Sequence, residues 1–148
     1  MDVELKLEQF LPYRLSLLSN TISAGIAATY REQYQLSVTE WRTIAILGRF
    51  PELSANQVAH KGAIDKVAVS RAVNRLLERG LLTRHIDPSD RRRSVLALTR
   101  DGHELHQQIA PAAIERESRL LAGLSQEEQN EFNRLIDKLL SVLASQET

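Results

Sequence analysis

Apolar residues recur with a helical period along most of this chain. Over residues 8–34 they follow one another at steps of three and four, which predicts a single long first helix. Ser37 and Glu40 then have the capping-box form, in which a hydroxyl and a carboxylate three residues apart satisfy free amides at a helix start. A second helix should therefore run from this point through Arg49, and Pro51 should stop it.

The same capping pattern begins again at Ser54 and predicts a short third helix that Gly62 ends. Asp65 can cap a longer helix over residues 66–79, and Gly80 can end it in the left-handed conformation that suits glycine. One side of this helix is an apolar stripe made of Val69, Val73, Leu76 and Leu77. The other side is polar, so the helix can pack on one face and contact a partner with the other.

After this helix the pattern changes to two short runs rich in β-forming residues, at positions 81–86 and 94–98. The residues between them, 87–93, contain the turn-forming pairs Asp-Pro and Ser-Asp, which predicts a hairpin with a long tip. The tip ends in Arg91, Arg92 and Arg93. Adjacent guanidinium groups repel one another and are costly to bury, so this tip should bind a polyanion.

Two more helices are predicted in the C-terminal third. Thr99 can cap the first, Gly102 indicates that another segment passes close to its backbone, and Pro111 should kink or break it. Ser125 with Glu128 marks the start of a closing helix. The apolar face of that helix consists of Phe132, Leu135, Ile136, Leu139, Leu140, Val142 and Leu143. A face this wide on a terminal helix is interpreted as partly a dimer interface.

Composition narrows the class of protein. With 148 residues, 43% of them hydrophobic, the chain can form one domain with a core, but its longest apolar runs are too short for a membrane span. The acidic N-terminus differs from a secretory signal, so we expect a cytoplasmic protein. Without cysteine there are no disulfides, cysteine nucleophiles or thiolate metal sites. The sequence has no phosphate-binding glycine loop and no recognisable catalytic frame, so we expect neither an enzyme nor a cofactor.

The charge is sorted along the chain although the net charge is zero. Residues 61–100 contain ten Lys or Arg and four Asp or Glu, a net charge of +6. The remaining residues contain nine basic and fifteen acidic side chains, a net charge of −6. A basic middle between acidic flanks suits a nucleic-acid-binding surface mounted on a soluble frame.

A short helix, a turn with glycine and a longer helix with a polar face form a helix-turn-helix, and the hairpin makes it winged. Such a helix fits the DNA major groove, and a ribbon with arginines can reach an adjacent minor groove. The segment DPSDRRRSVLALTRDG, with Asp90 and Arg92, resembles the D-x-R wing signature and the following LTxxG of the MarR family of bacterial transcription regulators. DKVAVSRAVNRLLERGLL resembles the recognition helix of that family, and the resemblance extends over nearly the whole chain.

This resemblance implies a mainly α fold with a small β-hairpin wing. A winged helix-turn-helix lobe at residues 36–99 would be joined to dimerisation helices at 1–35 and 100–148. The function implied is that of a ligand-responsive repressor, a homodimer on a palindromic operator in double-stranded DNA. Arg92 would enter the minor groove, with Asp90 orienting it. The candidate DNA-binding residues are Lys66, Ala68, Ser70, Arg71, Asn74, Arg75, Asp90, Arg91, Arg92 and Arg93.

Other readings stay open at this point. The resemblance suggests a cleft for a small aromatic or anionic effector, and the candidate residues are Tyr13, Arg14, Trp41, Arg42 and His106. His103 and His106 are three residues apart on a predicted helix and could share a metal ion, although no third ligand is identifiable and no metal site is assigned. A winged helix can also serve as a protein-interaction module, whose basic face would bind an acidic partner.

Overall fold

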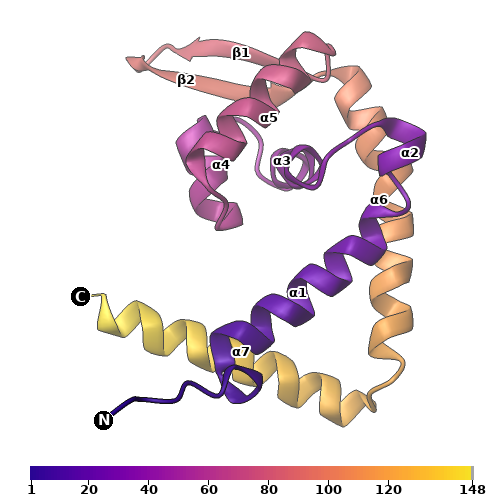
Figure 1. Ribbon diagram of the computed structural model, residues 1–148. Helices are drawn as coiled ribbons and strands as arrows, with labels where there is room; N and C mark the ends of the chain where they lie inside the picture. The colour runs from indigo at the N-terminus through magenta and orange to yellow at the C-terminus, as the bar shows by residue number, and fades with distance from the viewer. Residues whose placement is uncertain (148) are drawn as a thin grey trace. The chain divides into compact units, whose positions relative to one another are not determined.

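The computed structural model describes residues 1–147 and is mainly helical, with one antiparallel β-hairpin (Figure 1). A 3-10 helix at Leu7–Gln9 precedes α1 (Leu11–Ala27), α2 (Arg31–Tyr34), α3 (Val38–Arg49), α4 (Ala55–Gly62), α5 (Lys66–Glu78), β1 (Leu82–Asp87), β2 (Asp90–Leu98), α6 (Arg100–Leu121) and α7 (Gln126–Gln146). The predicted fold class is confirmed. The chain divides into two compact units, Met1–Ala113 and the residues from Ile114 onward. In the described part of the chain, no helix is both long and apolar enough to cross a membrane.

The prediction of one helix over residues 8–34 is wrong. α1 ends at Ala27, a turn follows, and the single-turn α2 ends before Gln35, whose φ of 53° is left-handed. The turn places Tyr30 in the core, where its side chain is 1% exposed and its ring centroid lies 5.8 Å from that of Trp41. The helical period of the apolar residues continues through this turn, so the period alone does not reveal the break.

The capping predictions are confirmed. Ser37 Oγ accepts a hydrogen bond from the amide of Glu40, and the Glu40 carboxylate accepts one from the amide of Ser37. The same reciprocal pair forms at the starts of α4 and α7. Asp65 caps α5 by accepting from the amide of Ala68 at 3.0 Å. These local bonds satisfy the amides that a helix leaves free at its first turn.

The end of α4 differs from the expectation by one residue. Gly62 is still helical, and Ala63 takes the left-handed conformation with φ 49°. Gly62 is needed for space, because a Cβ there would lie 2.7 Å from side-chain atoms of both Ile46 and Ile64. At Gly80, by contrast, φ is +72°, which confirms the predicted left-handed conformation of glycine after α5.

The core of the first unit gathers the apolar faces of α3, α5 and the hairpin. Its largest fully buried apolar side chains are Tyr30, Leu36, Ile44, Leu47, Val58, Val69, Val73, Leu76, Leu96 and Ile109. Three members of the predicted stripe of α5 are therefore fully buried, and burial of each such side chain contributes about 1.5–3 kcal/mol. The apolar side of α5 is fixed, and its polar side is left exposed.

The hairpin is longer and its tip shorter than the sequence predicts. β2 begins at Asp90, so the arginines lie on a strand, and only Pro88 and Ser89 separate β1 from β2. The Asp87 carboxylate closes this turn by accepting from the Ser89 hydroxyl at 2.7 Å and its amide at 2.9 Å. These two bonds, followed by the charge of Arg93, hold the pKa of Asp87 below its usual value. Asp87 pairs with Asp90 across the turn, and the register then shifts, so the three arginines lie between this pair and the pair of Ile86 with Ser94.

α6 confirms one expectation and corrects another. Thr99 Oγ1 accepts from the amide of Gly102 at 3.1 Å, and a Cβ at Gly102 would lie 2.2 Å from the carbonyl oxygen of Leu81. Gly102 is thus required by a close backbone approach, as predicted. Pro111 does not break the helix, which runs without interruption from Arg100 to Leu121. The φ of proline is itself helical, so the helix can continue past one missing hydrogen bond.

Candidate nucleic-acid interface

The exposed side of α5 carries a row of polar side chains. Lys66, Ser70, Arg71 and Asn74 are exposed and line one open cleft. The other wall of the cleft is the start of α4, at Ala55 and Asn56. Four of the predicted DNA-binding residues are therefore brought together. Ala68 lies outside the lining of this cleft and is half-buried.

Val67 lines the same cleft and was missed by the sequence analysis. Its side chain is 57% exposed, whereas Val69 and Val73 on the same helix are fully buried. The sequence predicts only polar and small residues as contacts on this helix. A usable signal was present, because Val67 falls outside the apolar stripe of the helix.

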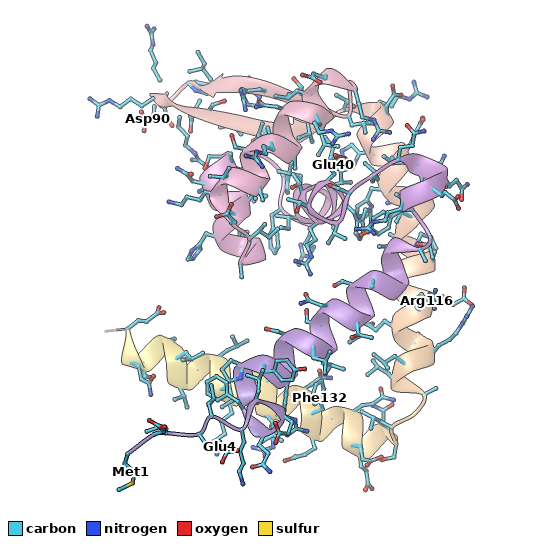
Figure 2. The ribbon with its side chains drawn as sticks, in the orientation of Figure 1. Met1, Glu4, Glu40, Asp90, Arg116 and Phe132 are labelled. Carbon is cyan, nitrogen blue, oxygen red and sulfur yellow. The ribbon has the colours of Figure 1, made fainter. Side chains whose placement is uncertain are left out.

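Arg75 occupies a different position on α5. Its Nε lies 3.4 Å from Oε1 of Glu40, whose side chain is 2% exposed, while the Arg75 side chain is 69% exposed. Figure 2 shows Glu40 inside the lobe, at the start of α3. One turn further on, Arg79 donates to the carbonyl oxygens of Tyr34 at 2.8 Å and Gln35 at 3.1 Å. Arg75 thus joins α5 to the start of α3, and Arg79, at the C-cap of α5, joins it to the end of α2.

The three wing arginines have different surroundings. Asp90 lies at the outer end of the hairpin (Figure 2), and its carboxylate accepts from the backbone amide of Arg92 at 3.0 Å. The side chains of Arg91 and Arg92 are exposed and have no bonding partner within residues 1–147. Arg93, in contrast, pairs with Asp87 at 3.4 Å and donates to Gln57 of α4. Two arginines are available for a partner, and the third ties the wing to α4.

The residues predicted for an effector are only partly brought together. The ring centroid of Trp41 lies 5.8 Å from those of both Tyr30 and His106. Arg42 donates to Ser23 Oγ near the end of α1 at 3.1 Å. Tyr13 and Arg14 lie near the other end of α1, outside this cluster, and both are exposed. Tyr30 completes the cluster and was not predicted as part of it, and burial raises the pKa of its phenol.

His106 titrates below the ordinary range. Burial, and next the neighbouring His103, lower the pKa of its imidazole from 6.5. A Cβ at Gly48 would lie 2.7 Å from the His106 ring, so α3 and α6 pack closely here. The folded protein therefore favours the neutral ring, and protonation opposes this packing.

Stability should consequently fall in mildly acidic solution. Below pH 6.5 the unfolded chain binds a proton at His106 more readily than the folded chain does. The contribution of the neutral imidazole to the free energy of unfolding is therefore complete above pH 6.5 and is lost as the pH falls. We expect the free energy of unfolding, measured with urea, to decline between pH 7.5 and pH 5.5. The decline should be shallower in His106→Gln; equal pH slopes for both proteins would contradict this assignment.

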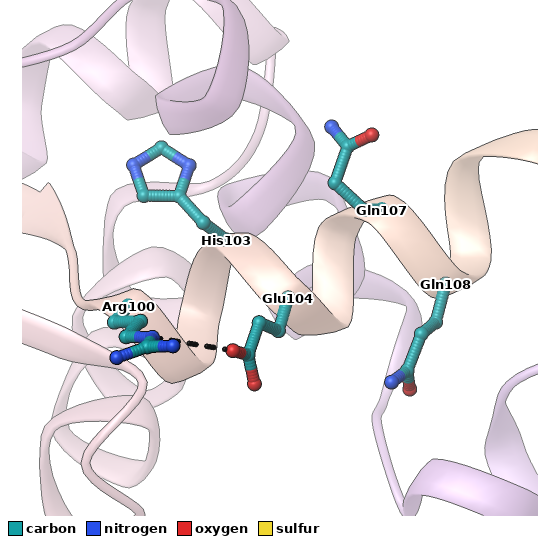
Figure 3. A pocket seen from close by; sticks show the side chains of 5 residues that line it. All are labelled: Arg100, His103, Glu104, Gln107 and Gln108. Carbon is teal, nitrogen blue, oxygen red and sulfur yellow. Dashed lines mark ion pairs between the residues drawn. The ribbon is translucent and has the colours of Figure 1, made fainter.

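The histidines do not form a recognisable metal site. Within residues 1–147, no group of three His, Cys, Asp or Glu side chains is placed to hold a metal ion. His103 lines an open hollow whose residues, Arg100, His103, Glu104, Gln107 and Gln108, all come from α6 (Figure 3). Arg100 Nε pairs there with Glu104 Oε1 at 3.4 Å, and His106 is not part of the lining. The structure thus supplies no ligand set for a metal-responsive regulator.

Comparison with known proteins shows which family the chain resembles. The sequence model of the MarR family matches residues 34–93, from the end of α2 to the third wing arginine. A MarR family regulator from Silicibacter pomeroyi DSS-3 is 28% identical, with a TM-score of 0.80, covering 95% of this chain and 99% of that one. A MarR/EmrR family regulator from Acinetobacter sp. ADP1 is 26% identical, with a TM-score of 0.84 and coverages of 95% and 99%.

The fold is also that of BpsR from Bordetella bronchiseptica, whose DNA binding is regulated by 6-hydroxynicotinic acid. That protein is 24% identical, with a TM-score of 0.78, and the match covers 93% of this chain and 97% of BpsR. Family model, fold and the winged arrangement of α4, α5 and the hairpin agree. The chain is therefore similar to the MarR family of transcriptional regulators over residues 34–93 and shares their winged helix-turn-helix fold over most of its length.

Proposed function

We propose that this protein is a sequence-specific regulator that binds double-stranded DNA as a homodimer and represses transcription by occupying a palindromic operator. One observation carries the proposal: the polar face of α5 and the unpaired wing arginines Arg91 and Arg92 belong to one packed lobe. A helix with Lys66, Ser70, Arg71 and Asn74 exposed suits the major groove, where such groups bond to base edges. Arg91 and Arg92 suit the phosphates or the minor groove beside it.

The homodimer is supported by apolar side chains that remain exposed. On α7 the predicted apolar face is 38–60% exposed at Phe132, Leu135, Ile136, Leu139, Leu140, Val142 and Leu143. On α1, Leu11, Leu15, Leu17 and Leu18 are 43–54% exposed. Apolar surface of this extent is costly in water, and a second copy of the chain would cover it. We therefore assign residues 1–35 and 100–148 to dimerisation and residues 36–99 to DNA binding.

A small aromatic anion is the proposed effector. The rings of Tyr30, Trp41 and His106 offer stacking surfaces, and Arg42 offers a guanidinium for a carboxylate. In BpsR, the ligand that regulates DNA binding is also an aromatic acid. The proposed place of action is the cytoplasm, where such an effector and the promoter DNA would both be available.

Selection of bound fragments from the genome that encodes the protein, with the purified full-length chain, tests this function. We expect enrichment of a palindromic site and a binding constant for that site that falls steeply between about 50 and 200 mM salt, since phosphate contacts release counterions. Fragments without sequence preference would contradict specific regulation and favour a protein-interaction module with an acidic partner. A non-palindromic site would contradict the homodimer.

Arg71 gives a residue-level prediction on the selected site. Arg71→Ala should weaken operator binding by about 1–3 kcal/mol and relax the preference at one base position in each half-site, because an arginine can pair with two acceptors of guanine. Arg100→Ala is the matched control, since Arg100 is 92% exposed on α6, outside the cleft. If Arg71→Ala weakened binding to operator and random DNA equally, Arg71 would not contact a base.

A further inference from the structure

We propose that Val67 is a specificity determinant that recognises the methyl group of thymine in each half-site. This inference rests on the proposed DNA-binding function and assigns one side chain to one chemical feature of the base pairs. It concerns a residue that the charge and polarity of the sequence do not single out.

The position of Val67 has no explanation in the packing of the protein. Its side chain is 57% exposed, whereas the other two valines of α5 are fully buried in the core. It stands among polar neighbours, with Lys66, Ser70 and Arg71 lining the same cleft. A branched apolar side chain also has a lower helix propensity than alanine. Exposure of this side chain therefore gains nothing for the folded protein alone.

Val67 is, however, well placed to contact a base. It is the second residue of α5, and in helix-turn-helix proteins the N-terminal residues of the recognition helix contact base edges. The cleft that it lines is open to solvent on the side opposite the core. Its two methyl groups cannot hydrogen-bond, so they can discriminate only by apolar contact.

The major groove offers one apolar feature, the C5 methyl of thymine. Arg71 follows Val67 by four residues, so the two side chains lie on the same side of α5, about 6 Å apart along its axis. Successive base pairs are about 3.4 Å apart. The selected thymine should consequently lie within about two base pairs of the position that Arg71 reads.

Replacement of operator thymines one at a time by deoxyuridine tests the contact, because this change deletes the methyl and keeps every hydrogen-bonding group. Burial of one such group is worth about 0.8 kcal/mol, which is about fourfold in affinity. For the homodimer we expect about 15-fold weaker binding when both half-sites carry the change at the critical position. Val67→Ala should bind the thymine and deoxyuridine operators equally.

Two comparisons secure the interpretation. Val67→Thr keeps one methyl and the branched shape, so it should retain part of the discrimination, and thermal melting should show that both variants are folded. If the wild-type protein has no sequence preference, the proposed function itself is overturned. If it binds its operator specifically but no thymine-to-deoxyuridine change matters, or if Val67→Ala discriminates as well as the wild type, the assignment of Val67 is overturned alone.

Discussion

Gly102→Ala should lower the free energy of unfolding by about 3 kcal/mol, at the upper end of what overpacking usually costs. The added Cβ would lie 2.2 Å from the carbonyl oxygen of Leu81 and 3.3 Å from Leu98 Cδ2. A backbone oxygen cannot move aside as a flexible side chain can. The same oxygen accepts the amide of Thr99 at 3.1 Å, so displacement of Leu81 also breaks the bond that begins α6.

Chemical unfolding followed by circular dichroism measures this effect. All proteins must be compared at one concentration, because the stability of the proposed homodimer would depend on it. Gly123→Ala is the matched control, since a Cβ at Gly123 meets only Leu120 O, at 3.3 Å, and a small change is expected. A Gly102→Ala protein within 0.5 kcal/mol of the wild type, taken as about the usual effect of surface substitutions, would mean that the close approach is not rigid.

The double variant Arg91→Ala/Arg92→Ala should weaken operator binding on the order of 100-fold at low salt. Both side chains are exposed without a partner among residues 1–147, so their removal leaves the lobe intact and costs only contacts with DNA. The proposed homodimer would lose four positive charges. Because each neutralised phosphate contributes about −0.9 to the salt dependence of binding, the slope should become shallower by up to about 4.

Titration of a fluorescent operator at several salt concentrations gives both quantities. Arg31→Ala/Arg100→Ala removes the same charge from α2 and α6, away from the wing and the cleft, and should leave the slope nearly unchanged. If both double variants reduce the affinity equally, the wing arginines act only through net charge. An unchanged affinity for Arg91→Ala/Arg92→Ala would overturn the role of the wing in binding.

The parts of the fold that depend on neighbouring residues were predictable from the sequence. Ser37, Ser54 and Ser125 form their capping boxes with partners three residues away, and the stripe of α5 follows from a period of under four residues. Gly102 was also recognised as a point of close approach. The caps and the stripe are encoded within one or two helical turns, whereas the close approach at Gly102 was indicated by its residue type alone.

The parts that depend on distant contacts were not predictable. Gln35, Glu52 and Ala63 have positive φ although none is glycine, so their residue types do not mark the conformation. The turn that buries Tyr30 places it against Trp41, eleven positions on. The arginines lie where the register shifts between the Asp87–Asp90 and Ile86–Ser94 pairs, which depends on how the two strands align. A pattern of single residues does not report such pairings.

The candidate interface was likewise predictable in part. The resemblance to the family singled out α5 and the wing, and the structure places Lys66, Ser70, Arg71 and Asn74 in one cleft. The resemblance did not distinguish Arg93 from Arg91 and Arg92, since all three are arginines and adjacent in sequence. Their difference arises from Asp87 and Gln57, which only the folded chain brings to Arg93.

The bond between Arg93 and Gln57 also bears on how an operator would be chosen. The Gln57 side-chain oxygen accepts both the amide of Ser54 at 2.9 Å and the guanidinium of Arg93, so one atom joins the start of α4 to the wing. The bond restrains the wing relative to α4, which with α5 forms the proposed DNA-binding cleft, before any duplex is bound. The duplex must adjust its groove width and bending to that arrangement, at an energy that depends on base sequence. Base pairs that no side chain touches would then contribute to the choice of operator through their stiffness.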